Sequence, residues 1–194
     1  MRILPRRYIR YKGVNSFFMG LTVGAIFTIY AVLDPSIFSA GGIVLALGML
    51  AVAKMYEKIL NLRTFFYISL FVELVMLAMV VWYLLMPYGV TTALLVYAGY
   101  QLTFMFGSYL VRAETLFLNR KPILSWLDMA KQIGYLAGML VSWLFYKILI
   151  LGFGVTDHTR QVYELHWLLL VTELLIIGLL LRSFEKVKKR AARR

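Results

Sequence analysis

Residues 122–147 read PILSWLDMAKQIGYLAGMLVSWLFYK. This run is apolar and long enough to cross a bilayer, yet an acid, a base and an amide lie in its first half. On a helix, four polar residues would fall at positions i, i+3, i+4 and i+7 and form one stripe: Asp128, Lys131, Gln132 and Tyr135. Ionisable residues inside a membrane span usually face a bundle interior or a water-filled path, so the stripe is a candidate for part of a translocation site. The alternative is an Asp128–Lys131 pair that neutralises itself near the membrane surface and only fixes packing.

The composition excludes an ordinary soluble domain, because 62% of the residues are hydrophobic and only 15% are charged. The net charge of +12 comes from bases at segment ends and in the tail. These bases indicate topology and not a nucleic-acid surface, which would carry exposed aromatic residues among them. There are no cysteines, and the two histidines lack a metal-ligand spacing. We therefore expect no metal and no cofactor.

Six apolar segments predict an all-α integral membrane protein with six transmembrane helices in a single domain, 1–194. The expected spans are 14–33, 37–56, 64–86, 90–111, 122–147 and 164–181. The first span is too long for a cleaved secretory signal. A connector is expected to begin at Arg112 and to include Glu114. Residues 149–163 are expected to form the longest exterior loop, partly helical at its end.

The distribution of basic residues predicts the orientation in the membrane. Eighteen lysines and arginines lie on the side of the two termini, whereas only Lys147 and Arg160 lie on the other side. The positive-inside rule places both termini in the cytoplasm, which indicates a multi-pass protein of the inner (plasma) membrane. Residues 186–194 are expected to form a basic cytoplasmic tail attracted to anionic membrane lipid.

The two halves of the chain contain similar sequence patterns. The pattern Gly-Met-Leu followed six residues later by Tyr occurs in 48–56 and again in 138–146, and Glu73 and Glu173 lie in similar apolar runs. The pseudo-repeats 13–87 and 88–185 would each hold three spans, so they would have opposite orientations in the membrane, as in many secondary transporters. Chance matching of common apolar residues is the alternative explanation.

With these features the chain resembles one six-helix half of a major facilitator superfamily transporter. The glycine-rich run 125–138 is similar to the fifth helix of that family, but the connector 53–63 lacks the aspartate and both glycines of the family's motif between helices two and three. A complete member has two halves with the substrate between them. The resemblance therefore implies a small-molecule substrate and a homodimer of half-size units.

The first functional hypothesis is a proton-coupled secondary transporter of a small polar solute. Glu73 and Glu173, expected at equal depth, would exchange protons, because desolvation opposes permanent ionisation of a carboxyl at mid-bilayer. The expected substrate contacts are Asp128, Lys131, Gln132, Tyr100 and Gln101. Alternatively, the glutamates only join helices by hydrogen bonds, and the protein is a membrane scaffold or accessory subunit. An enzyme is not expected, because no nucleophile and base have a suitable spacing.

Small residues at four-residue intervals predict close contacts between helices. They form three ridges: Gly20, Gly24 and Thr28; Gly99, Thr103 and Gly107; and Gly134, Gly138 and Ser142. The resemblance implies that spans three and six are peripheral, although each carries a glutamate. Since an ionised carboxylate in lipid is unfavourable, either these faces turn inward or another subunit covers them. We expect at least two chains per particle, with Glu73 and Glu173 shielded by protein.

Overall fold

A computed structural model describes residues 1–185 of the chain, and the predicted basic tail 186–194 lies outside this range. The described part is almost entirely helical. Its elements are β1 (Arg2–Ile3), α1 (Pro5–Tyr30), α2 (Pro35–Lys54), α3 (Tyr56–Ile59), α4 (Leu62–Leu85), α5 (Val90–Met105), α6 (Gly107–Phe117), α7 (Lys121–Phe153), α8 (His158–Ser183) and β2 (Phe184–Glu185). Counting α5 and α6 as one span, six helices are long and apolar enough to cross a membrane, which is compatible with a multi-pass membrane protein.

Several helices begin or end at residues that are typical of helix ends. Prolines occupy the first turns of α1, α2 and α7, where a missing backbone N–H costs nothing. The side chain of Asp157 caps α8 by accepting a hydrogen bond from the backbone N–H of Arg160 at 2.9 Å. Gly154 ends α7 with a φ of 65°, a conformation that favours glycine.

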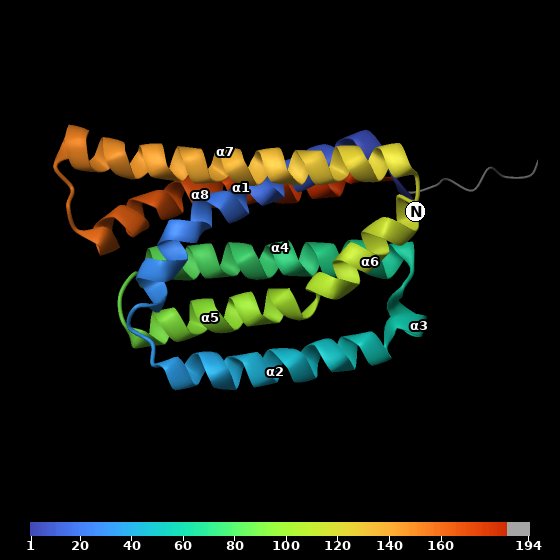
Figure 1. Cartoon of the computed structure of the whole chain (residues 1–194), viewed down its shortest axis with the longest axis horizontal. Coiled ribbons are helices and arrows are strands. Elements are labelled where there is room, and N and C mark those ends of the chain that lie inside the picture. Colours follow the sequence, from blue (N-terminus) through green and yellow to red (C-terminus); the bar gives the residue numbers. More distant parts are fainter. Residues whose placement is uncertain (186–194) are drawn as a thin grey trace, which may run out of the picture.

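Two predicted boundaries are wrong. The loop expected to begin at residue 149 begins only after Phe153, where α7 ends, whereas the expected helix at its end is present because α8 begins at His158. The connector expected from Arg112 is also wrong, because α6 runs to Phe117. The span that begins at Val90 breaks at Phe106, just before Gly107, and α6 leaves the break at an angle to α5 (Figure 1).

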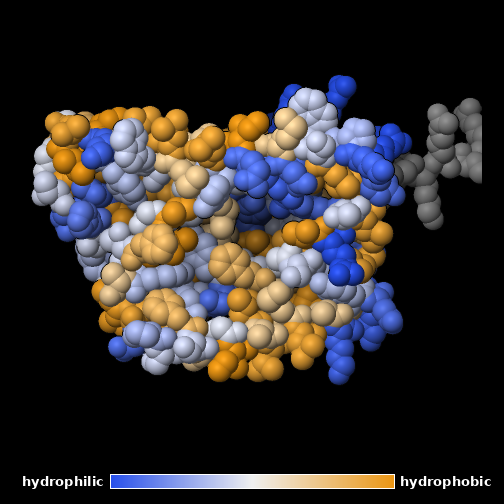
Figure 2. All heavy atoms as spheres, in the orientation of Figure 1, coloured by the Kyte–Doolittle hydropathy of each residue, from blue (hydrophilic) through white to orange (hydrophobic). Residues whose placement is uncertain are grey.

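The six spans form a flattened bundle with α7 along one side and α2 along the other (Figure 1). α1 crosses the bundle obliquely and packs against both α7 and α8, while α4 packs against α8 and α5. Hydrophobic residues cover much of the visible surface, and hydrophilic residues gather at the end where the chain begins (Figure 2). We call this the basic end, defined by Arg6, Arg7, Arg10, Arg63, Arg120 and Arg182.

Glycine allows α1 and α7 to touch along their backbones. A Cβ atom added to Gly138 would lie 2.1 Å from the carbonyl oxygen of Phe17, and one added to Gly20 would lie 2.2 Å from that of Tyr135. The predicted ridges on spans one and five therefore pack against each other within one chain.

The two ends of the described chain are joined at the basic end. β1 pairs with β2 in an antiparallel register, and the backbone N–H of Leu4 donates to the carbonyl oxygen of Ser183 at 2.9 Å. Phe184 is thereby held against the ring of Tyr8, with the ring centres 6.0 Å apart. This pairing, for which the sequence gives no local signal, fixes the start of α1 relative to the end of α8.

The cap of α4 gives a first testable prediction. The Asn61 side-chain oxygen accepts a hydrogen bond from the backbone N–H of Thr64 at 2.9 Å, whereas Asp34 at the start of α2 makes no such bond. Asn61→Ala should lower the free energy of unfolding by about 1 kcal/mol, measured by denaturant titration in detergent. Asp34→Ala is the matched control and should cost less; an equal or larger cost for Asp34→Ala would contradict this assignment.

Candidate functional site: a buried ionisable cluster

The site begins with a polar stripe on α1 that the sequence analysis did not single out. Tyr8, Tyr11, Lys12 and Asn15 lie at positions i, i+3, i+4 and i+7 of one helix. Tyr8 and Tyr11 are buried, and Lys12 and Asn15 are partly buried. The spacing repeats that of the stripe at 128–135, so the same periodicity search would have found it. Lys12 was interpreted only as part of the basic N-terminal segment.

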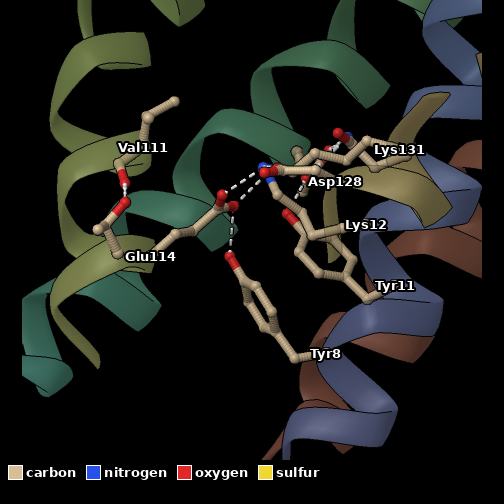
Figure 3. Close-up of polar contacts among 10 residues, drawn as sticks. Tyr8, Tyr11, Lys12, Val111, Glu114, Asp128 and Lys131 are labelled. Atoms are coloured by element: carbon tan, nitrogen blue, oxygen red, sulfur yellow. Dashed lines mark hydrogen bonds and ion pairs between the residues drawn. The ribbon is translucent and has the colours of Figure 1, made fainter. Parts of the chain in front are cut away.

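Glu114 of α6 is the centre of the first group of contacts. Its carboxylate accepts a hydrogen bond from the Tyr8 hydroxyl at 2.8 Å and forms ion pairs with Lys12 at 2.9 Å and Lys131 at 2.6 Å. Figure 3 shows Glu114 pointing from α6 toward these residues on α1 and α7. Glu114 is only 2% exposed and lies within α6, so its placement in a connector is wrong. This residue joins three helices.

The charges around Glu114 nearly balance. Two ammonium groups share this one buried carboxylate, and Asp128 lies 3.7 Å from Lys131 at the edge of the group. The side chain of Asp128 is 73% exposed, whereas that of Lys12 is only 14% exposed. Charges removed from water need close partners with good geometry, so each lysine depends on Glu114.

Glu73 of α4 and Glu173 of α8 form the second group, deeper in the bundle. Glu73 accepts hydrogen bonds from the Tyr11 hydroxyl and from the Asn15 amide, the latter at 3.1 and 3.2 Å to its two oxygens. The carboxyl of Glu173 lies within interaction distance of that of Glu73. Glu173 is fully buried, and neither of its oxygens has a hydrogen-bond partner among residues 1–185.

The two groups are one turn apart on α1. Tyr8 contacts Glu114, Tyr11 contacts Glu73, and the two tyrosine ring centres are 5.4 Å apart. Farther along α1, Thr22 and the buried Tyr100 of α5 line the same small space. Thus a line of hydroxyl, carboxyl and ammonium groups runs from the basic end into the middle of the bundle.

A small cavity continues this line. It has a volume of about 20 Å³, and its polar lining residues include Thr22, Tyr100 and His166. This volume is enough for one water molecule. The His166 ring is stacked on Tyr83 at 3.9 Å, and its Nδ1 lies 2.7 Å from the carbonyl oxygen of Val162. Polar groups therefore extend past Glu173 toward the end of the bundle opposite the basic end.

The structure does not bring the expected substrate-binding residues together as one set. On α7, Asp128 and Gln132 are exposed, whereas Lys131 turns inward to Glu114. Tyr100 is buried, and Gln101 is partly buried with a side-chain oxygen that makes no hydrogen bond within the described chain. The polar stripe on α7 is therefore divided between the bundle interior and the surface.

One face of the molecule is hollowed beside α7. Figure 2 shows the surface hollowed between α7 and α4, with hydrophilic residues gathered along α7 above the hollow. Asp128 and Gln132 are exposed residues of α7. Of the five expected substrate contacts, these two remain accessible from outside.

The two mid-helix glutamates lie in the interior of the bundle on α4 and α8, which pack against each other, and their equal depth stays a prediction. Both are covered within one chain, with 2% of Glu73 and none of Glu173 exposed. Of the two expected arrangements, the structure shows the one in which the glutamate faces turn inward, so no second chain is needed to cover these groups. A homodimer no longer follows from this argument and stays a prediction.

Comparison with known proteins finds no match. No model of a known protein family, no curated protein and no solved structure matches the chain. The fold and the buried cluster define a chain with six potential membrane spans and an ionisable core, and its function must be inferred from that core.

Proposed function

We propose that the protein is a half-size, proton-coupled secondary transporter of a small polar solute, built on the plan of one half of a major facilitator superfamily transporter. The observation that carries this proposal is the pair Glu73 and Glu173 in the middle of the bundle. One carboxyl is satisfied by Tyr11 and Asn15, while its neighbour is buried without a partner in the described chain.

The chemistry of this pair suits proton exchange. Two carboxyl groups that are close together and removed from water cannot both ionise without a large electrostatic cost. A change of conformation that opens the pair to one side of the membrane changes this cost, so it changes the affinity for a proton. Such a coupled change is what a proton-driven transporter requires.

The order of helix packing supports an inverted repeat. In the first three spans, α1 packs against α7 and α8 of the other half. In the last three spans, α5 packs against the corresponding helices α2 and α4. α4 and α8, which carry Glu73 and Glu173, pack against each other. If α1, α2 and α4 are exchanged with α5, α7 and α8 in that order, these contacts stay the same. Such a pattern is expected for two three-helix repeats of opposite orientation in the membrane.

Solute binding is proposed on the exposed side of α7, where Asp128 and Gln132 are accessible. Lys131 joins this surface to Glu114 and hence to the interior line of polar groups. One half-size unit supplies one wall of a path, and a second copy with both termini in the cytoplasm would supply the other.

A second candidate is a membrane scaffold or accessory subunit that does not transport. The closed centre of the bundle favours it, because the cavity beside Tyr100 and His166 has room for a water molecule and not for a solute. In that case Glu73 and Glu173 would only stabilise the contact between α4 and α8, and neutral replacements would leave the function intact.

Proton flux in liposomes separates the two candidates. The purified chain is reconstituted with a pH-sensitive dye inside, and amino acids, sugars, nucleosides and organic acids are added in turn. We expect at least one solute class to change the internal pH, and the E73Q/E173Q variant to lose this response. Dimeric protein that is folded yet gives no response to any class would contradict the proposal and favour the scaffold.

A further inference from the structure

Three arginines converge at the basic end between α1 and α8. A hollow of about 430 Å³ is lined by Arg7, Arg10 and Arg182 together with one apolar residue, Leu179. Arg7 donates a hydrogen bond to the backbone carbonyl of Arg182 at 3.3 Å, which holds one guanidinium at the end of α8. We call this the arginine hollow.

No acidic side chain balances the arginine hollow. Within residues 1–185, none of its three arginines forms an ion pair with a carboxylate, and residues 186–194 contain no aspartate or glutamate. Guanidinium groups that line one small space repel each other. The contrast with Lys12 and Lys131, which share Glu114, is clear: the interior charges have a partner within the chain, whereas those of the hollow do not.

The position of the hollow favours a lipid over a soluble ion. Arg7 and Arg10 lie in the first turns of α1, and Arg182 lies in the last turn of α8, where a spanning helix leaves the hydrocarbon region. On the other side of α1, the same two arginines border a second hollow of about 800 Å³. Its apolar lining includes Ile9, Ile123 and Trp126, and Trp126 is 64% exposed. Tryptophan is the residue typical of the membrane interface.

We propose that the arginine hollow binds the phosphate of an anionic phospholipid head group. Guanidinium groups match phosphate oxygens in a bidentate geometry, and the negative charge removes the repulsion among the three arginines. The acyl chains would run down the apolar surface beside Leu179. This binding holds the start of α1 to the end of α8 and is independent of the transport reaction.

Lipid-dependent melting of the full chain in neutral detergent tests the proposal. The variant R10Q/R182Q removes two guanidinium groups but retains Arg7 and its bond to the backbone at position 182. K54Q/K58Q is the matched control, because it removes two exposed charges from the same end of the bundle, on α2 and α3. Short-chain phosphatidylglycerol, phosphatidylcholine with the same chains, and inorganic phosphate are titrated separately.

We expect phosphatidylglycerol to raise the melting temperature of the wild type and of K54Q/K58Q at the same lipid concentration. R10Q/R182Q should need at least about ten times more lipid for half of the shift, because charge-assisted hydrogen bonds are lost. Should R10Q/R182Q fold poorly, R10K/R182K replaces it; it keeps the charge and should still bind more weakly than the wild type. An equal loss in K54Q/K58Q, or equal stabilisation by phosphatidylcholine or by inorganic phosphate, would overturn the proposal.

Discussion

The Gly138→Leu variant should fail to form the native bundle. A side chain at this position would meet the backbone of α1, with its Cβ atom 2.1 Å from the Phe17 carbonyl oxygen and 3.0 Å from the Gly20 Cα atom. Backbone atoms of a packed helix cannot move aside as the end of a flexible side chain can. Since α1 and α7 would have to separate along their contact, we expect a loss of more than about 3 kcal/mol, beyond ordinary overpacking of a core.

Gly42→Leu is the matched control for this variant. Gly42 is an exposed glycine in α2, and a Cβ atom there would meet nothing within 4 Å. Yield of monodisperse protein in detergent and thermal melting are the measurements. Gly42→Leu should behave as the wild type, and normal yield and melting of Gly138→Leu would contradict the close packing of α1 against α7.

Glu114→Gln should be the most damaging single change in the ionisable cluster. The amide cannot neutralise Lys12 and Lys131, which contact this carboxylate at 2.9 and 2.6 Å. Breaking a buried pair by removing one partner costs about 3–5 kcal/mol, because the remaining charge is left without compensation. Unfolding of the purified protein in a denaturing detergent measures this loss.

Two controls separate lost pairing from a general effect of removing an acid. Glu185→Gln breaks the exposed pair with Arg2 and should change the stability by no more than about 1 kcal/mol. The triple variant K12M/E114M/K131M removes the charges together and should recover much of the stability that Glu114→Gln loses. If the triple variant is less stable than Glu114→Gln, the ion pairs are not the reason for the loss.

The apolar runs predict the six spans well, because their length and composition dominate the local sequence. The ends of the spans are harder. Residues 148–153 are apolar, and the helix α7 continues through them until Gly154. In α6, Ala113 and Glu114 are buried while Arg112 and Thr115 are exposed, so a stretch that resembles a polar connector is an amphipathic helix.

The stripe on α7 shows why the site was only partly predictable. Periodicity places Asp128, Lys131 and Gln132 close together on a helix, but it does not decide which of them faces the interior. The glycine ridge decides, because Lys131 shares a face with Gly134 and Gly138, which pack against α1. Asp128 and Gln132 are turned away from that contact.

Glu73 and Glu173 were predicted because a carboxyl in the middle of an apolar run is conspicuous. Glu114 was missed because it follows Arg112 near the end of a span, where charged residues are common. Its partners Tyr8 and Lys12 are more than a hundred residues away in the sequence. A single sequence contains no local signal for such a contact.

The most direct test of the account compares two reactions of the Glu173→Gln variant in the same liposomes. With the solute found by the proton-flux assay, one reaction is exchange of labelled solute across the membrane, and the other is uptake driven by a proton gradient. If Glu173 carries the proton, the variant should keep exchange and lose proton-driven uptake. Loss of both reactions, or retention of both, would contradict the assignment of the Glu73–Glu173 pair as the proton-coupling site.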